Sequence, residues 1–125
     1  MNTKALGDAS TAMVLARLAL QGKSVMVPHG DKDRFDLALY EDGKFSRIQC
    51  KTGRLKNGTV RFAVRSVYSH AKGQHVIRTY EGQVEFFGVF CPETDGVYLV
   101  PVDVVGAAKS MKWLPQEEIE KFRLR

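Results

Sequence analysis

The chain has 125 residues, of which 44% are apolar and 26% are charged, so we expect one soluble globular domain over residues 1–125 and no second core. It contains no run of ~18 or more apolar residues, and residues 1–10 lack the apolar run of a secretory signal, which excludes a membrane-spanning helix and predicts a cytoplasmic protein. The net charge of +5 favours an anionic partner, most often nucleic acid, although many basic domains bind none.

The first predicted element is a helix over residues 4–21. Leu6, Met13 and Leu20 repeat every seven residues, and alanines between them continue the same stripe. We therefore expect this stripe to face the core.

Strand patterns follow the helix. Residues 24–28 predict a short strand, and residues 34–40 and 44–51 alternate between apolar and polar side chains, as half-buried strands do. Between the two alternating segments, Asp42-Gly43 is a strong signal for a tight hairpin.

The second half of the chain contains further strand patterns and one segment without a clear period. The predicted elements are a turn over 53–58, a strand over 59–64, a long loop or loosely ordered arm over 65–83, paired strands over 85–91 and 97–102, and a short helix beginning near Pro115. A helix followed by strands in hairpins predicts an α+β fold with a mixed or antiparallel sheet.

A few other residues carry weaker signals. Cys50 and Cys91 are far apart, lack the spacing of metal ligands and lie in apolar stretches, so we expect buried reduced thiols. Tyr68 and Tyr80 could stack on bases or pack the arm, and the region of Trp113 is expected to close the core or a subunit interface.

The hairpin turn fixes how the two alternating strands pair. Tyr40 then faces Phe45, and continuing this register puts Asp36 opposite Gln49 on one face, with Cβ atoms about 5 Å apart. Lys51 lies two residues further along on that face, at a diagonal distance of about 7–8 Å. The opposite face is predicted to be core and carries Leu37, Leu39, Ile48 and Cys50.

One sheet face would therefore combine a carboxylate, an amide oxygen and an ammonium group. The oxygens of Asp36 and Gln49 are of the kind that hard divalent cations prefer, and the backbone carbonyl of Cys50 could add a third. Such a cation can polarise a phosphodiester and activate a water, while Lys51 positions that water or steadies the developing charge. The alternative is an exposed polar strand pair without chemistry.

The segment from Lys44 to Arg78 contains no acidic residue. Its basic side chains, and Arg34 at the start of the first alternating strand, could bind the phosphates of nucleic acid or could form an ordinary solvated face. The candidate DNA contacts are Arg34, Arg47, Arg54, Lys56, Arg61, Arg65, Lys72 and Arg78.

Asp36 followed by Gln49-Cys50-Lys51 resembles the PD-(D/E)xK nuclease motif, with Gln in the acidic place. The whole chain resembles the small branch of that superfamily that includes group I intron homing endonucleases and archaeal Holliday-junction-resolvase-like proteins. The matching pieces are residues 6–10, 25–62 and 85–103, in the expected order.

The resemblance implies a restriction-endonuclease-like core, an α/β sandwich in which an N-terminal helix precedes a mixed, largely antiparallel sheet. It also implies Mg²⁺-dependent cleavage of double-stranded or branched DNA, with Mn²⁺ as a substitute ion, by a homodimer or homotetramer. By the resemblance, Asp36 and Gln49 would ligate the metal, and Lys51 would be the catalytic lysine.

The sequence departs from the family pattern in its first helix. Family members usually carry a glutamate four residues after the helix glycine, and counting from Gly7 reaches Thr11. Asp8 lies on the same helix face one turn earlier and could substitute as a metal ligand, or could be only a first-turn acid that favours the helix dipole. Without it, Asp36 is the single anionic ligand, and Mg²⁺ binding is expected to be weak.

Three functions follow from these observations. The first is a metal-dependent DNA endonuclease that cuts with Asp36, Gln49 and Lys51. The second is a catalytically weakened or inactive nuclease fold that binds DNA or regulates another protein, motivated by Thr11. The third is a structural subunit that binds no nucleic acid.

Overall fold

The computed structural model describes residues 2–30, 32–69, 75–80, 82–106 and 108–125, without the side chains of 66–69 and 75–79. Its central element is a five-stranded sheet, called the large sheet, in the order β1-β2-β3-β8-β9. Its strands are β1 (Ser24–Met26), β2 (Leu37–Glu41), β3 (Lys44–Thr52), β8 (Phe86–Cys91) and β9 (Gly96–Pro101). β3 and β8 run parallel and the other neighbours antiparallel, so the predicted mixed, largely antiparallel sheet is confirmed.

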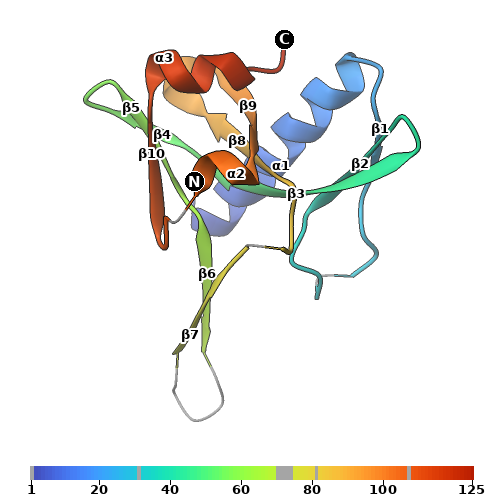
Figure 1. Cartoon of the computed structure of the whole chain (residues 1–125), viewed down its shortest axis with the longest axis horizontal. Coiled ribbons are helices and arrows are strands. Elements are labelled where there is room, and N and C mark those ends of the chain that lie inside the picture. The colour runs from blue at the N-terminus through green and yellow to red at the C-terminus, as the bar shows by residue number, and fades with distance from the viewer. Residues whose placement is uncertain (1, 31, 70–74, 81, 107) are drawn as a thin grey trace.

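The large sheet is covered on both faces. Helix α1 (Thr3–Leu20) lies along one face, behind the strands in the view of Figure 1. A three-stranded sheet, called the small sheet, packs on the other face in the order β10-β5-β4, with β10 (Met111–Pro115), β5 (Thr59–Ala63) and β4 (Arg54–Lys56). The predicted α+β sandwich is confirmed, and none of the described helices has the length and apolar character needed to cross a membrane.

The remaining elements are short. They are η1 (Pro92–Thr94), α2 (Val102–Val105), α3 (Gln116–Ile119), η2 (Glu120–Phe122), and an antiparallel hairpin of β6 (Arg65–Ser69) and β7 (His75–Thr79). Figure 1 shows this hairpin extending away from the layered body.

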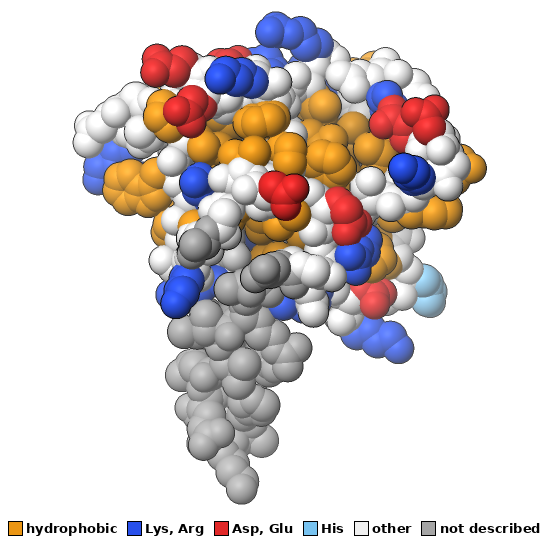
Figure 2. Space-filling model, in the orientation of Figure 1, with side chains coloured by type: hydrophobic (Ala, Val, Ile, Leu, Met, Phe, Trp, Pro, Cys, Tyr) orange, Lys and Arg blue, Asp and Glu red, His pale blue; other side chains and the backbone are white. Residues whose placement is uncertain are grey.

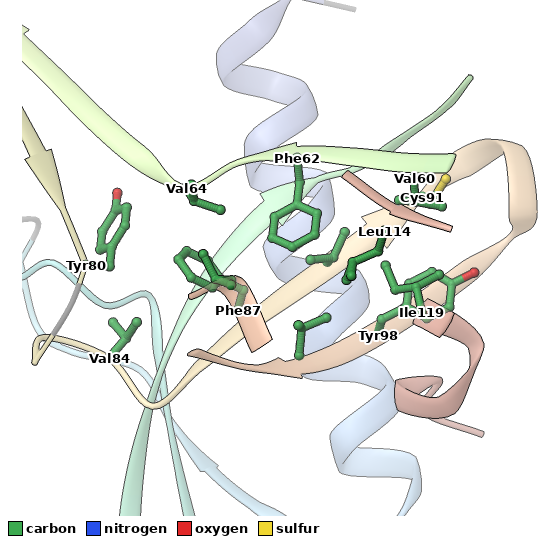
Figure 3. Close-up of a cluster of buried hydrophobic side chains, with 13 residues drawn as sticks. Val60, Phe62, Val64, Tyr80, Val84, Phe87, Cys91, Tyr98, Leu114 and Ile119 are labelled. Carbon is green, nitrogen blue, oxygen red and sulfur yellow. The ribbon is translucent and has the colours of Figure 1, made fainter. Parts of the chain in front are cut away.

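Strand alternation divides the apolar side chains between two cores. In β9, Val97 faces α1, whereas Tyr98 and Val100 face the small sheet. Figure 3 shows the second core, in which Phe62 of the small sheet lies close to Phe87 of the large sheet, with ring centroids 5.9 Å apart. Both cysteines are buried and unpaired, as expected.

The buried stripe of α1 differs from the prediction. The helix buries Ser10, Val14 and Leu18, while Leu20 is 81% exposed. The buried residues are spaced four apart within the helix, whereas Leu20 is its last residue. Asn2 caps the helix, because its side-chain oxygen accepts a hydrogen bond from the Ala5 N–H at 2.8 Å.

The predicted hairpin register is confirmed from Glu41↔Lys44 to Leu37↔Ile48. Asp42 and Gly43 both have positive φ, at 53° and 78°, as a tight turn of the hairpin type requires. The predicted core face of this hairpin is buried at all four positions, Leu37, Leu39, Ile48 and Cys50.

The second half of the chain contains three strand features that the sequence did not predict. Residues 53–58 are not all turn, because β4 occupies Arg54–Lys56 and only Asn57-Gly58 turns the chain, with φ of 52° and 76°. Residues 65–83 contain the β6–β7 hairpin instead of a long loop. The tail forms the predicted short helix directly after Pro115, and it also forms β10. Trp113 on β10 is 56% exposed and does not close the core, so its predicted role at a subunit interface stays a prediction. In each case the strand is stabilised by a partner distant in sequence or by a hairpin that local alternation did not reveal.

Candidate active site

Asp36 lies where β2 ends. Its backbone N–H donates to the Ile48 carbonyl at 2.8 Å, and its carboxylate Oδ2 accepts the backbone N–H of Cys50 at 2.8 Å. The side chain thus takes an N–H that a longer β2 would bind, as short aspartate side chains often do. Asp36 therefore lies outside the ladder, at the edge of β3, and is not a ladder partner of Gln49 as the sequence had suggested.

Cys50 presents two different groups. The N–H and C=O of one strand residue point to the same edge, so its carbonyl faces the edge on which Asp36 lies. Its thiol faces α1, where it forms a hydrogen bond with the Thr11 side chain, and burial raises the pKa of the thiol to about 12. The thiol therefore stays neutral, and the carbonyl is the group that can serve as a ligand.

Gln49 and Lys51 alternate with Cys50, so their side chains extend from the sheet face opposite α1. The parallel register places them beside Phe87 and Val89 of β8, and both are half-buried. The Lys51 Nζ lies 3.4 Å from the Tyr80 hydroxyl. Lys51 is also close enough to Asp36 to lower the pKa of that carboxyl.

Asp36 has a raised pKa overall. Burial is the largest cause, and the negative charge of Asp8 adds to it, while the Cys50 N–H and the charge of Lys51 act in the opposite direction. A partly buried carboxylate whose negative charge is only partly balanced is stabilised by a neighbouring cation.

The first turns of α1 approach this carboxylate. Asp8 acts electrostatically on Asp36, but it is exposed and pairs with Lys4, whose Nζ lies 3.4 Å from its Oδ2. Thr11 donates to the Gly7 carbonyl at 3.2 Å and also contacts the Cys50 thiol. The helix position that usually bears the family's glutamate therefore brings a hydroxyl, not a carboxylate, to the site.

The oxygen atoms of the site are of the type that a hard divalent cation binds, but few of them carry a negative charge. The candidate ligands are oxygens of Asp36, Gln49 and Cys50, the ligand type that Mg²⁺ selects. Within the described part of the chain, no group of three or more Asp, Glu, His or Cys side chains gathers in a way that could hold a metal. Asp36 is thus the central charge of any such site, and Asp8 the nearest candidate to support it.

Two of the candidate DNA contacts are engaged by acids that the sequence reading had not singled out. Glu85 binds both the Arg47 guanidinium, with Nη2–Oε2 at 2.6 Å, and the Arg47 backbone N–H, and Arg47 lowers the Glu85 pKa in return. Glu93 binds Arg54 at 3.1 Å. The positive charges of Arg47 and Arg54 are thus balanced by neighbouring carboxylates, which weakens their attraction for a phosphate.

Other basic candidates lie beside aromatic rings. Arg61 lies over the Trp113 ring, 4.7 Å from its centroid, and Arg34 lies over the Tyr80 ring at 4.1 Å. Lys56 is exposed and Arg65 half-buried. Lys72 lies outside the described residues, as does the side chain of Arg78. On the face drawn in Figure 2, acidic and basic side chains are interspersed.

The comparisons with known proteins agree with this fold. Residues 1–123 match the sequence model of a family described as PD-(D/E)XK endonuclease. Among solved structures, the chain is similar to a bacterial homing endonuclease, I-Ssp6803I, with 25% sequence identity and a TM-score of 0.77 over 91% of this chain and 78% of that one. No curated protein matches the sequence.

Proposed function

Because the chain belongs to the PD-(D/E)XK endonuclease family, as its motif predicted, we propose that it is a metal-dependent DNA endonuclease that hydrolyses phosphodiester bonds. The observation that carries the proposal is the Asp36 carboxylate at the end of β2, bound to the Cys50 N–H, with Lys51 close by. The similarity to a homing endonuclease favours a duplex target, and a branched junction is the second candidate substrate.

The metal proposed is Mg²⁺, with Mn²⁺ as a substitute ion, held by Asp36, Gln49 and the Cys50 carbonyl, with Asp8 as an additional candidate. When bound there, the ion would supply Lewis-acid polarisation of a phosphate oxygen and a more acidic water.

The protein's own groups would orient the reactants. The backbone N–H of Cys50 fixes the Asp36 carboxylate at 2.8 Å, so this ligand is held before substrate arrives. The Lys51 ammonium can donate hydrogen bonds to the phosphate or to the attacking water, which stabilises negative charge as it develops. The half-buried surroundings strengthen both interactions relative to water.

We propose that double-stranded or branched DNA is the partner, contacted by basic residues of the acid-free segment and by Arg34. Cutting both strands of a duplex, or two arms of a junction, calls for two sites, so we propose a homodimer or a homotetramer.

A second candidate function is a nuclease fold with weakened or lost cleavage that binds DNA. The observation that favours it is Thr11, which brings a hydroxyl where a carboxylate would complete the charge around Asp36. Binding of a divalent ion by one carboxylate and neutral oxygens is then weak.

The decisive experiment is cleavage of supercoiled plasmid and of a four-way junction, first with Mg²⁺ and then with Mn²⁺. We expect the wild type to cut, and Lys51→Ala to cut about 10²-fold more slowly or not at all, because one charged group contributes this much to catalysis. DNA affinity should change by less than about threefold, since one phosphate contact among several is lost.

Lys23→Ala provides a matched control, because Lys23 pairs with Glu41 near β1 and has the same charge as Lys51. Equal cutting by wild type and Lys51→Ala would contradict the endonuclease proposal. DNA binding without cutting in either ion would support the second candidate function.

A further inference from the structure

Tyr80 lies where the β6–β7 hairpin joins the body of the protein. Only 4% of it is exposed, and its ring packs edge-on against Phe87, with centroids 5.6 Å apart. Its carbonyl accepts the N–H of Gln83 at 2.9 Å, so a turn fixes its backbone. Figure 3 shows Tyr80 at one end of the buried cluster, beside Val64 and Val84. The ring is therefore held by the core.

Two cations share this ring. The Arg34 guanidinium carbon lies 4.1 Å from the ring centroid, and the Lys51 Nζ lies 4.8 Å from the same centroid and 3.4 Å from the hydroxyl. The face of an aromatic ring carries partial negative charge and attracts cations. Lys51 belongs to β3, and Arg34 belongs to the segment before β2 that also carries Asp36, so one core residue contacts side chains from both parts of the site.

The shared ring also sets an upper limit on the distance between the two cations. The Arg34 guanidinium carbon and the Lys51 Nζ can be no farther apart than the sum of their distances to the ring centroid. One phosphodiester group can span that distance and accept a hydrogen bond from each cation. An anion that contacts both cations is attracted by both.

We propose that Tyr80 is a positioning residue, which orders Lys51 and Arg34 as a pair of cations for one phosphodiester beside Asp36. This inference rests on the proposed function and deepens it, because it identifies what holds the lysine. A lysine side chain has many rotamers, and a contact with a rigid buried ring reduces their number before DNA binds. The hydroxyl lies 3.4 Å from the Lys51 Nζ, and the ring contacts both cations.

The first test follows Lys51 without DNA or metal. Lysine reactivity is measured by trace labelling with acetic anhydride and mass spectrometry. The anhydride must reach the amine, and the Tyr80 side chain covers one side of the Lys51 Nζ. We expect Tyr80→Leu to raise labelling of Lys51 by about threefold or more, relative to Lys23 in the same sample, and Tyr80→Phe to change it by less than about twofold.

Tyr98 offers a matched control. It is fully buried and has its own cation, Arg123, with the guanidinium carbon 5.2 Å from its ring centroid. Tyr98→Leu should leave Lys51 labelling unchanged, because this tyrosine belongs to the other end of the cluster. Unchanged Lys51 labelling in folded Tyr80→Leu would overturn the inference, as would an equal rise in Tyr98→Leu.

Folding of each variant is checked by circular dichroism. If Tyr80→Leu does not fold, Tyr80→Met replaces it, because a flexible unbranched side chain can fill the space of the ring without offering a π-face. The same rise in labelling is expected, and its absence has the same meaning.

The second test uses single-turnover cleavage. Tyr80→Leu should slow cleavage by about tenfold or more with DNA affinity within about twofold, whereas Tyr80→Phe should retain most of the rate, because a misplaced catalytic group affects the rate more than binding. If the wild type does not cut, the proposed function fails, but the labelling test still decides whether Tyr80 orders Lys51. Normal cleavage by Tyr80→Leu would contradict the role in cutting.

Discussion

At the scale of single residues, the site depends on one carboxylate. Asp36 is held by a backbone N–H. The positive charge of Lys51 lowers the pKa of the Asp36 carboxyl, and the negative charge of Asp8 raises it. Thr11 of α1 contributes a hydroxyl that already bonds with the Gly7 carbonyl and the Cys50 thiol. A substitution at position 11 can therefore change how much negative charge the site offers to a divalent ion.

Thr11→Glu should strengthen binding of Mg²⁺ about tenfold, because a second carboxylate near Asp36 supplies the hard anionic ligand that Mg²⁺ prefers. Isothermal titration calorimetry of the protein with Mg²⁺ measures the change directly. If cleavage is limited by metal binding, the Mg²⁺ concentration for half-maximal cutting should fall in parallel.

The matched control is Thr11→Gln, which has the same length and loses the same hydrogen bond to Gly7 but adds no charge. It should leave Mg²⁺ affinity near the wild-type value. Equal gains in Thr11→Gln and Thr11→Glu would show that charge at this position is not the limiting factor.

At the scale of elements, the position of α1 depends on a close approach to β8. A Cβ built on Gly88 would lie 2.8 Å from the Val14 Cγ1 and 3.1 Å from the Ile48 Cγ2. These atoms belong to the helix and to β3, both packed into the same core. The absence of a side chain at Gly88 therefore lets the helix that carries Asp8 and Thr11 lie against the sheet that carries the site.

Gly88→Ala should lower the free energy of unfolding by about 1–3 kcal/mol, because a methyl group added to a filled core forces its neighbours apart. Urea denaturation followed by circular dichroism measures the loss. Gly7→Ala is the matched control, because Gly7 lies in the exposed part of α1 with open space around it. That change should raise stability by up to ~1 kcal/mol through helix propensity. A stable Gly88→Ala variant would mean that α1 is free to shift.

At the scale of the whole molecule, the positive charge is distributed unevenly along the chain. The net charge is +5, and residues 44–78 contain no acid. The fold nevertheless brings Glu85 to Arg47 and Glu93 to Arg54. Arg61 differs from both, because its guanidinium lies over Trp113 and its Nε, within the described structure, is buried without a hydrogen-bond partner.

Arg61→Gln should weaken DNA binding at low salt and reduce the slope of log K against log salt by about one, because one phosphate contact is lost. Fluorescence anisotropy of a labelled duplex at several salt concentrations gives the slope. Lys23→Ala removes the same charge near β1, where Lys23 pairs with Glu41. The arginine assignment would fail if both variants changed the slope equally.

The sequence by itself determined the hairpin, its register and the family. Asp42-Gly43 requires a tight turn, and strict alternation leaves one register in which Leu37 and Ile48 are both buried. These are local effects, so they can be deduced from neighbouring residues. The motif of Asp36, Gln49 and Lys51 depends on the same register, which is why the family followed from the sequence.

Only the tertiary structure decided which contacts these residues make. β4 and β10 form because β5 lies between them, and nothing near Trp113 in the sequence indicates that partner. In the same way, the sequence did not reveal that Asp36 binds the Cys50 N–H or that Tyr80 joins Lys51 to Arg34. Such contacts join residues that are distant in sequence, so they exist only after both cores have formed.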